Sequence, residues 1–93
     1  MEISDIVESL NGRDRGAYFF VIDMDDDYVY LADGKGRPAD KPKRKRHKHA
    51  RLIARVEGGT AKKIRSGERI QNSELRRALA AFAAETGRTE GGL

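Results

Sequence analysis

The chain has 93 residues, of which 38% are hydrophobic and 37% are charged, and a chain of this length forms one domain with a modest core. It contains no cysteine, which excludes disulfides, thiolate metal ligands and cysteine nucleophiles, and we expect a protein of the reducing cytoplasm. The net charge of +4 conceals an uneven distribution, because residues 1–33 carry nine acidic and two basic side chains whereas residues 34–65 carry 13 basic and two acidic ones.

Three strands are predicted in the first third of the chain. Residues 3–10 show a weak strand pattern that ends at Asn11-Gly12, a pair that favours a turn. Residues 17–24 are rich in aromatic and β-branched side chains and form the strongest predicted strand. Residues 25–27 are all aspartate, and the apolar pattern resumes over residues 28–32, so a hairpin is expected here.

The strand predicted over residues 17–24 is apolar on both faces. Because side chains alternate along a strand, one face should carry Tyr18, Phe20, Ile22 and Met24. The other face should carry Phe19 and Val21. A strand of this kind is expected where a small sheet curls into a barrel.

The basic block occupies a predicted loop between two strands. Residues 35–49 contain glycine, two prolines and an almost unbroken run of Lys, Arg and His, which predicts a solvated loop. The apolar pattern returns over residues 52–56 as a fourth strand that ends at Gly58-Gly59. The block attracts polyanions, although charge alone does not choose between a nucleic acid, a membrane surface and an acidic protein.

Two helices are predicted after the fourth strand, where the apolar period changes from two to about 3.6 residues. Thr60 is a candidate N-cap for a short helical turn that ends at Gly67. Asn72 or Ser73 is expected to cap a longer helix that ends near Thr86. The apolar face of this helix should carry Leu75, Ala78, Leu79 and Phe82.

Together these elements predict a mainly β fold with a C-terminal helix. We expect a small antiparallel β-barrel within residues 1–59, interrupted by the basic loop 35–49 and followed by a helical extension over residues 60–86. Gly87 suits a helix C-cap, and residues 87–93 should form a frayed tail.

The segment Val7–Gly16, with the apolar strand after it and with Val29–Gly34, resembles a KOW motif. The closest similarity is to the KOW-containing large-subunit ribosomal proteins of the archaeal and eukaryotic type, and it includes the basic stretch Lys41–Arg51. The resemblance covers about residues 5–56. It implies an SH3-like barrel that binds RNA.

The resemblance also implies roles for the residues of the first turn. Gly16 matches the near-constant glycine of the motif, and a glycine permits the positive φ of a tight turn. Arg13 and Arg15 would face RNA. The chain departs from the motif in its acidic residues, above all Asp23 and residues 25–27, which would repel phosphate and restrict RNA to one side of the molecule.

The candidate site is a cationic surface, because Lys and Arg neutralise phosphates and His hydrogen-bonds or stacks. Two alternatives stay open. The basic run could be a solvated tether or localisation signal, and the charges of Arg13 and Arg15 could simply be balanced by Asp14. Tyr28 and Tyr30 could stack on unpaired bases, whereas Phe20 is expected in the core. The expected RNA-binding residues are Arg13, Arg15, Lys35, Arg37, Lys41, Lys43, Arg44, Lys45, Arg46, His47, Lys48 and Arg51, with Gly12 and Gly16 as structural turn residues.

Other kinds of site are not indicated by the sequence. His47 and His49 lie in a cationic run without a nearby carboxylate cluster, so no metal site is expected. A calcium loop beginning at Asp23 would have Tyr28 where glycine is needed and Gly34 where glutamate is needed. No nucleophile motif is present, and we expect no catalysis, no cofactor and no small-molecule substrate.

The expected function is therefore non-catalytic binding of ribosomal RNA or another structured RNA, with ribosomal proteins as further partners. The alternative is a protein-interaction adaptor that uses the acidic face or the C-terminal helix. The N-terminus lacks the basic and apolar regions of a signal peptide, and the apolar stretches 17–22 and 78–84 are too short to span a bilayer. No membrane partner is expected.

Overall fold

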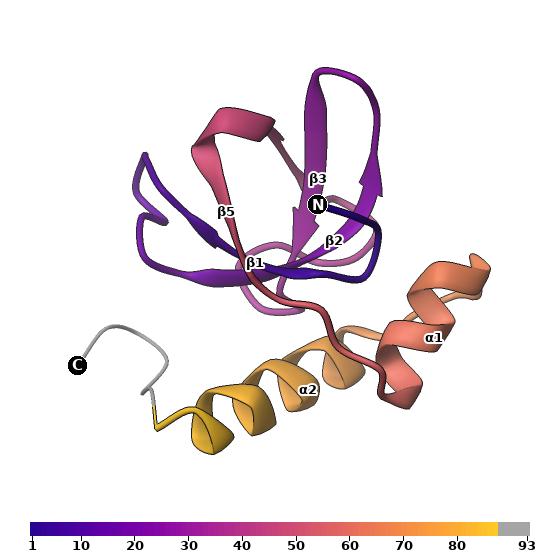
Figure 1. The fold of residues 1–93 in the computed structure, drawn as a ribbon. Coiled ribbons are helices and arrows are strands. Elements are labelled where there is room, and N and C mark those ends of the chain that lie inside the picture. Colours follow the sequence, from indigo (N-terminus) through magenta and orange to yellow (C-terminus); the bar gives the residue numbers. More distant parts are fainter. Residues whose placement is uncertain (88–93) are drawn as a thin grey trace.

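Five antiparallel strands and two α-helices make up residues 1–87, the part of the chain described by this computed structural model. The strands form a strongly curled sheet, and both helices lie together below it in the view of Figure 1. The strands are β1 (Ile6–Ser9), β2 (Tyr18–Met24), β3 (Tyr28–Ala32), β4 (Lys43–Arg46) and β5 (Ala50–Ala54); the helices are the 3-10 turn η1 (His47–His49), α1 (Gly59–Ser66) and α2 (Asn72–Glu85).

The strands are ordered β4-β3-β2-β1-β5, and each neighbouring pair is antiparallel. The two edge strands, β4 and β5, follow each other in the sequence and are linked by η1. The predicted mainly β fold with a C-terminal helix is thus confirmed. Among the described residues the hydrogen-bonded order ends at β4 and β5, so the ladder itself is an open sheet.

Hydrophobic side chains pack on both faces of the sheet. The cluster between the sheet and the helices is formed by Ile6, Phe20, Ala32, Ile64, Leu75 and Leu79. The cluster on the opposite face is formed by Val7, Phe19, Val21, Val29, Leu31 and Ala50. Ala78 and Phe82 pack against the first cluster, which confirms the apolar face predicted for the long helix. The sheet therefore has a hydrophobic cluster on each face, and the helices cover only the first of them.

β2 contributes to both clusters, because alternate side chains face opposite sides of the sheet. As predicted, Phe20 packs against the helices and Val21 packs on the opposite face. The face predicted for Met24 is wrong, since the register with β3 shifts between Val21 and Asp23 and Met24 packs with the opposite cluster. A β-bulge adds one residue to a strand and reverses the alternation beyond it.

The first strand is shorter than the predicted range of residues 3–10. Ser4 has a positive φ of 78°, and its N–H donates to the carbonyl of Val21 at 2.7 Å. The chain therefore turns just before β1 begins. Asp5, at this turn, is buried and accepts a hydrogen bond from Arg55 Nε at 3.1 Å.

The prediction of a solvated loop over residues 35–49 is wrong in its second half. β4 lies within this range and pairs with β3, and η1 follows it directly. The main chain of a basic residue joins a ladder as readily as that of an apolar one, and charged side chains are common on edge strands. The strand predicted over residues 52–56 begins two residues early, because Ala50 already pairs with Ser9.

Both α-helices begin without the side-chain caps expected from the sequence. α1 begins one residue before Thr60, after an extended Gly58, and α2 begins at Asn72. The Asn72 side chain instead accepts a hydrogen bond from the backbone N–H of Ala39 at 2.8 Å. This bond ties the start of α2 to the β3–β4 loop.

Both α-helices are followed by a glycine with positive φ. Gly67, at 77°, ends α1 in the left-handed conformation as predicted, and Gly87, at 73°, lies just beyond α2. The rest of the predicted tail, residues 88–93, lies outside the described residues. Within residues 1–87, no helix has the length and apolar character needed to cross a membrane.

Candidate nucleic-acid interface

β4 divides the basic run between the two faces of the sheet. Lys43 and Lys45 lie opposite two residues of β3 that are buried in the core. Side chains alternate along a strand, so Arg44 and Arg46 lie on the other face, where both are exposed. The four cations of this strand therefore have two different environments.

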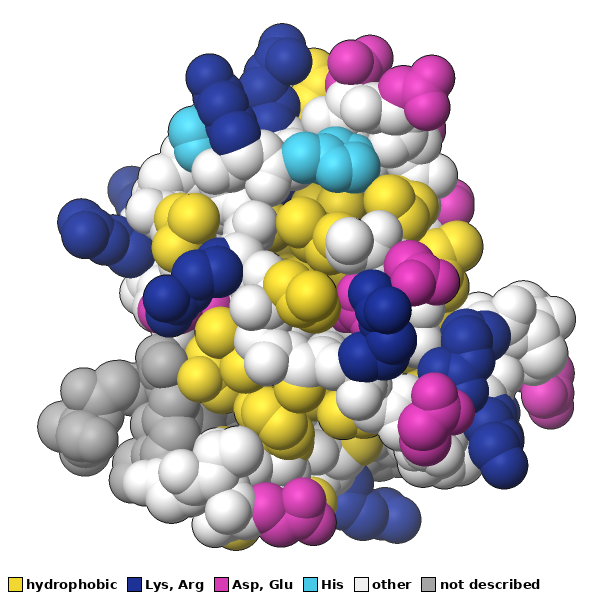
Figure 2. All heavy atoms as spheres, in the orientation of Figure 1, with side chains coloured by type: hydrophobic (Ala, Val, Ile, Leu, Met, Phe, Trp, Pro, Cys, Tyr) yellow, Lys and Arg dark blue, Asp and Glu magenta, His cyan; other side chains and the backbone are white. Residues whose placement is uncertain are grey.

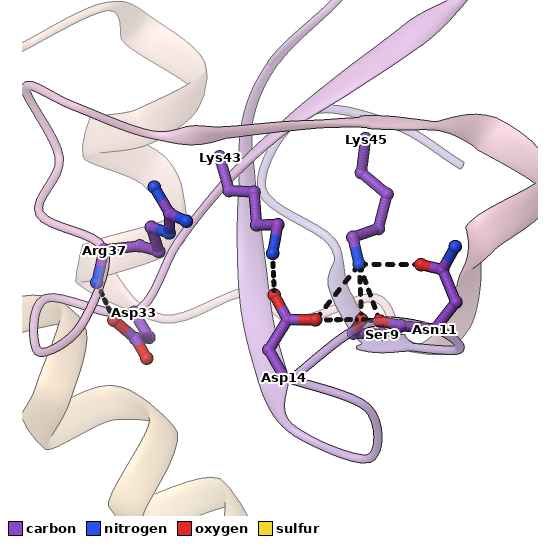
Figure 3. Close-up of polar contacts among 7 residues, drawn as sticks. All are labelled: Ser9, Asn11, Asp14, Asp33, Arg37, Lys43 and Lys45. Atoms are coloured by element: carbon purple, nitrogen blue, oxygen red, sulfur yellow. Dashed lines mark hydrogen bonds and ion pairs between the residues drawn. The ribbon is translucent and has the colours of Figure 1, made fainter.

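Lys45 is buried, with only 6% of its surface exposed. Its Nζ atom lies 2.7 Å from Ser9 Oγ, 3.0 Å from both the carbonyl and the side-chain oxygen of Asn11, and 3.1 Å from Asp14 Oδ1. Figure 3 shows these contacts converging on the ammonium group from the β1–β2 loop. Lys45 thus joins β4 to the end of β1 and to this loop.

Asp14 is the carboxylate at the centre of this network. Burial raises its pKa, but hydrogen bonds from Ser9, Lys43 and Lys45 and the charge of Lys45 outweigh that effect and lower the pKa to about 2. Lys43 Nζ lies 2.9 Å from Asp14 Oδ2, and the Ser9 hydroxyl donates to Asp14 Oδ1 at 2.7 Å. Asp14 therefore remains ionised and is neutralised internally.

The β1–β2 loop is held in a fixed shape that leaves two arginines outside. Gly12 and Gly16 have positive φ values of 80° and 87°, and the Gly16 N–H donates to the carbonyl of Ser9 at 2.8 Å. Arg13 and Arg15 are exposed, and neither forms a side-chain hydrogen bond or ion pair with another residue of the described chain. The loop therefore presents two guanidinium groups to solvent.

On the other face of β4, two arginines lie against one tyrosine ring. The guanidinium carbon of Arg44 is 4.5 Å from the centroid of the Tyr28 ring, and that of Arg46 is 5.2 Å from it. Both distances are within the range of cation–π interactions. The cross-strand register accounts for the contact, because Tyr28 pairs directly with Arg46.

The acidic β2–β3 hairpin lies beside this tyrosine and is internally bonded. Asp25 Oδ1 accepts the N–H groups of Asp27 and Tyr28, and its Oδ2 accepts the Tyr30 hydroxyl at 2.9 Å. These bonds lower the pKa of Asp25, and the bond to Asp25 raises the pKa of Tyr30. His47 Nε2 lies 2.9 Å from the Asp25 carbonyl, which joins the hairpin to η1.

The turn η1 brings further predicted residues to the same end of the molecule. Figure 2 shows Lys, Arg and His side chains gathered where Figure 1 places η1, with acidic side chains beside them over the β2–β3 hairpin. Lys48 is exposed, and Arg51 is paired with Glu8. The carbonyl of His49 accepts the N–H of Leu10 at 2.9 Å, so η1 adjoins the start of the β1–β2 loop.

Three predicted residues, Lys35, Arg37 and Lys41, form a separate group on the β3–β4 loop. The side chain of Asp33 shapes this loop by accepting the N–H groups of Lys35 and Arg37, both at 2.9 Å. All three basic side chains are exposed. Because the loop is tied to the start of α2 by Asn72, this group adjoins the helices rather than η1.

Sequence reasoning missed the internal role of Lys45 and the residues that hold it. An exposed, phosphate-facing Lys45 is contradicted by its burial. The signal that could have revealed it is the spacing of Lys43 and Lys45, which share one face if the run is a strand. The alternative in which Asp14 balances Arg13 and Arg15 does not hold, because Asp14 is paired with Lys43 and Lys45 of β4.

Within residues 1–87, no group of three His, Asp or Glu side chains is placed to hold a metal ion. The candidate interface is thus a set of cations with an acidic hairpin at its side. A comparison of the chain with protein-family models and with curated proteins finds no match.

Proposed function

We propose that this protein binds RNA, either ribosomal or another structured RNA, and catalyses no reaction. The observation that carries the proposal is the β1–β2 loop, in which Arg13 and Arg15 are exposed while Asp14 between them is turned inward to Lys45. Two arginines without a competing carboxylate on the same loop suit the planar recognition of phosphate groups.

Further exposed cations extend this site. Arg44, Arg46 and Lys48 form no ion pair with another described residue, and they lie on β4 and η1. The nearest acid on β1, Glu8, is already paired with Arg51. Five cations therefore remain available to phosphates at this end of the molecule.

A KOW-type, SH3-like barrel is part of the same proposal. The backbone ladder leaves β4 and β5 unjoined, but the Lys45 side chain bridges β4 to the β1–β2 loop and η1 links the two edge strands. A curled sheet with this bridge supports the fold that the KOW resemblance implies. A cytoplasmic location follows for a partner of ribosomal RNA and ribosomal proteins.

The second candidate is a protein-interaction adaptor. It is favoured by a partly apolar groove between α2 and the segment after β5, with a volume of about 240 Å³. Val56, Ala78 and Phe82 contribute apolar side chains to it. Such grooves accept hydrophobic segments of partner proteins.

Capture of partners with and without nuclease separates the two candidates. RNA binding predicts that purified protein binds purified RNA and that captured partners are lost after complete RNA removal. Partners that survive nuclease treatment, together with no binding of purified RNA, would establish the adaptor function instead. Co-sedimentation with ribosomal subunits then distinguishes ribosomal RNA from other structured RNA.

A further inference from the structure

The outer face of β3 and β4 carries two tyrosines and two arginines in direct register. Tyr28 pairs with Arg46, and Tyr30 pairs with Arg44. Side chains of directly opposed residues lie close enough to interact. The result is a compact group of two aromatic rings and two guanidinium planes on one face of the sheet.

This group is accessible and lacks carboxylate partners for its arginines. Arg44 and Arg46 are exposed, Tyr28 is half-buried, and neither arginine is ion-paired to another residue within 1–87. The guanidinium groups lie instead at 4.5 and 5.2 Å from the Tyr28 centroid. Both guanidinium groups are therefore held beside the ring by cation–π attraction rather than by an ion pair with another described residue.

We propose that Tyr28, Arg44 and Arg46 form a stacking site for an unpaired base of RNA. The inference rests on the proposed RNA-binding function and specifies that the RNA is single-stranded at this point. Unpaired bases stack on aromatic rings and on arginine guanidinium planes. A base within a duplex is already stacked on its neighbours, so its face is not available to such a site.

The acidic hairpin sets the orientation of the bound nucleotide, because it repels phosphate from its own side of the site while the charges of Arg44 and Arg46 still attract the phosphates on the other side. Asp25 is joined to the site through the Tyr30 hydroxyl and through the N–H of Tyr28. Its exposed neighbours Asp26 and Asp27 add negative charge that repels phosphate. Carboxylates accept hydrogen bonds from base N–H groups, so the nucleotide is oriented with its base toward the hairpin and its phosphate toward Lys48.

Replacing both arginines by lysine tests the stacking while preserving the charge. Lysine keeps the attraction for phosphate but lacks the planar guanidinium. We expect the double variant Arg44→Lys/Arg46→Lys to bind a short single-stranded RNA about tenfold more weakly, with the dependence of affinity on salt unchanged. A second variant, Tyr28→Leu, should lose a similar factor, and thermal unfolding of both variants checks that the fold is intact.

A matched RNA series identifies the stacked base itself. In a set of oligomers that each carry one abasic position, the wild-type protein should bind one of them about tenfold more weakly than the intact RNA, and the lysine variant should not distinguish that pair. If the lysine variant and the wild type bind all oligomers equally, the stacking proposal is overturned. If that binding still depends on salt, the proposed RNA-binding function stands. Failure of the wild type to bind any RNA overturns both proposals.

Discussion

At the residue scale, Lys45 supplies a connection that the backbone ladder does not make. Its ammonium group joins β4 to Ser9, Asn11 and Asp14 on the far side of the gap in the sheet. A buried ammonium is costly unless it is paired and hydrogen-bonded, and here all its donors have oxygen partners. Removing only one side of such a network leaves the other side buried and unpaired.

Lys45→Met should therefore lower the free energy of unfolding by about 3 kcal/mol, because it leaves the Asp14 carboxylate with one partner fewer in a poorly solvated position. Lys43→Met is the matched control, and the loss should stay below about 1 kcal/mol, since the Lys43 side chain is 25% exposed and makes one ion pair. Urea denaturation followed by circular dichroism measures both. Equal losses for the two variants would contradict the role given to Lys45.

The same network predicts a pH dependence of stability. The folded state lowers the pKa of Asp14 from 3.8 to about 2, so the carboxylate stabilises the fold above about pH 4 and this contribution is lost as the pH falls toward 2. The shift corresponds to about 2 kcal/mol. Urea denaturation at several pH values should show that the free energy of unfolding falls less between about pH 4 and pH 2 in Asp14→Asn than in the wild type. An equal fall in both proteins would be inconsistent with the network.

At the element scale, β4 explains which parts of the site were predictable. The β1–β2 loop, the β2–β3 hairpin and the helix over residues 72–85 follow from turn pairs, β-rich composition and the 3.6-residue period. The strand β4 could not be predicted from its sequence, KRKR, because all four residues are basic. It therefore lacks the alternation of apolar and polar residues that identifies a half-buried strand. Only the tertiary contacts with Ser9 and Asp14 make Lys45 an interior residue and Lys43 a half-buried one.

Two further departures also depend on contacts between distant segments. Met24 changes face because of a bulge against β3, which single-strand alternation does not register. The side-chain oxygen of Asn72 accepts the backbone N–H of Ala39, 33 positions away, instead of capping its own helix. Local propensity suggested the alternation and the cap, and tertiary packing replaced both.

The junction between β3 and α2 provides a test at the same scale. Gly34 has a φ of 77°, and a Cβ atom there would lie 2.2 Å from the Asn72 carbonyl oxygen. Gly34→Ala should destabilise the protein by about 2–4 kcal/mol, through backbone strain and displacement of α2. A Cβ atom at Gly36, on the same loop, would meet no atom within 4 Å, so Gly36→Ala should change stability by less than about 1 kcal/mol. Chemical denaturation of the two variants measures both effects. Similar losses would disprove the close packing of Gly34 against Asn72.

At the scale of the whole molecule, the fold separates the basic and acidic residues into distinct groups. The basic residues of the sheet fall into an internal pair, a group near η1 and a group beside α2, while the acidic hairpin marks the edge of the η1 group. This division predicts unequal roles in RNA selectivity. Arg13 and Arg15 lie on a loop fixed by Lys45, so less conformational entropy is lost when they bind.

Arg13→Gln/Arg15→Gln should consequently change the ranking of affinities among different RNAs. Lys35→Gln/Lys41→Gln removes the same charge from the β3–β4 loop, which adjoins the helices and lies apart from the proposed site, so it should leave this ranking unchanged. Competition binding with a panel of RNAs compares the two variants. An unchanged ranking in the first variant would refute the role of the fixed loop.

The dependence of RNA affinity on salt is the most direct measure of whether the cations of the proposed site bind RNA. If Arg13, Arg15, Arg44, Arg46 and Lys48 each neutralise one phosphate of unpaired RNA, the log–log slope should be about −3.5, or about a hundredfold loss of affinity between about 50 and 200 mM salt. Replacing the four arginines by glutamine should flatten the slope to about −0.7, while the control Lys62→Gln/Arg77→Gln, with both sites exposed on the helices, should leave it unchanged. A wild-type slope near zero, or one that the four substitutions do not alter, would show that these cations do not form an RNA-binding surface.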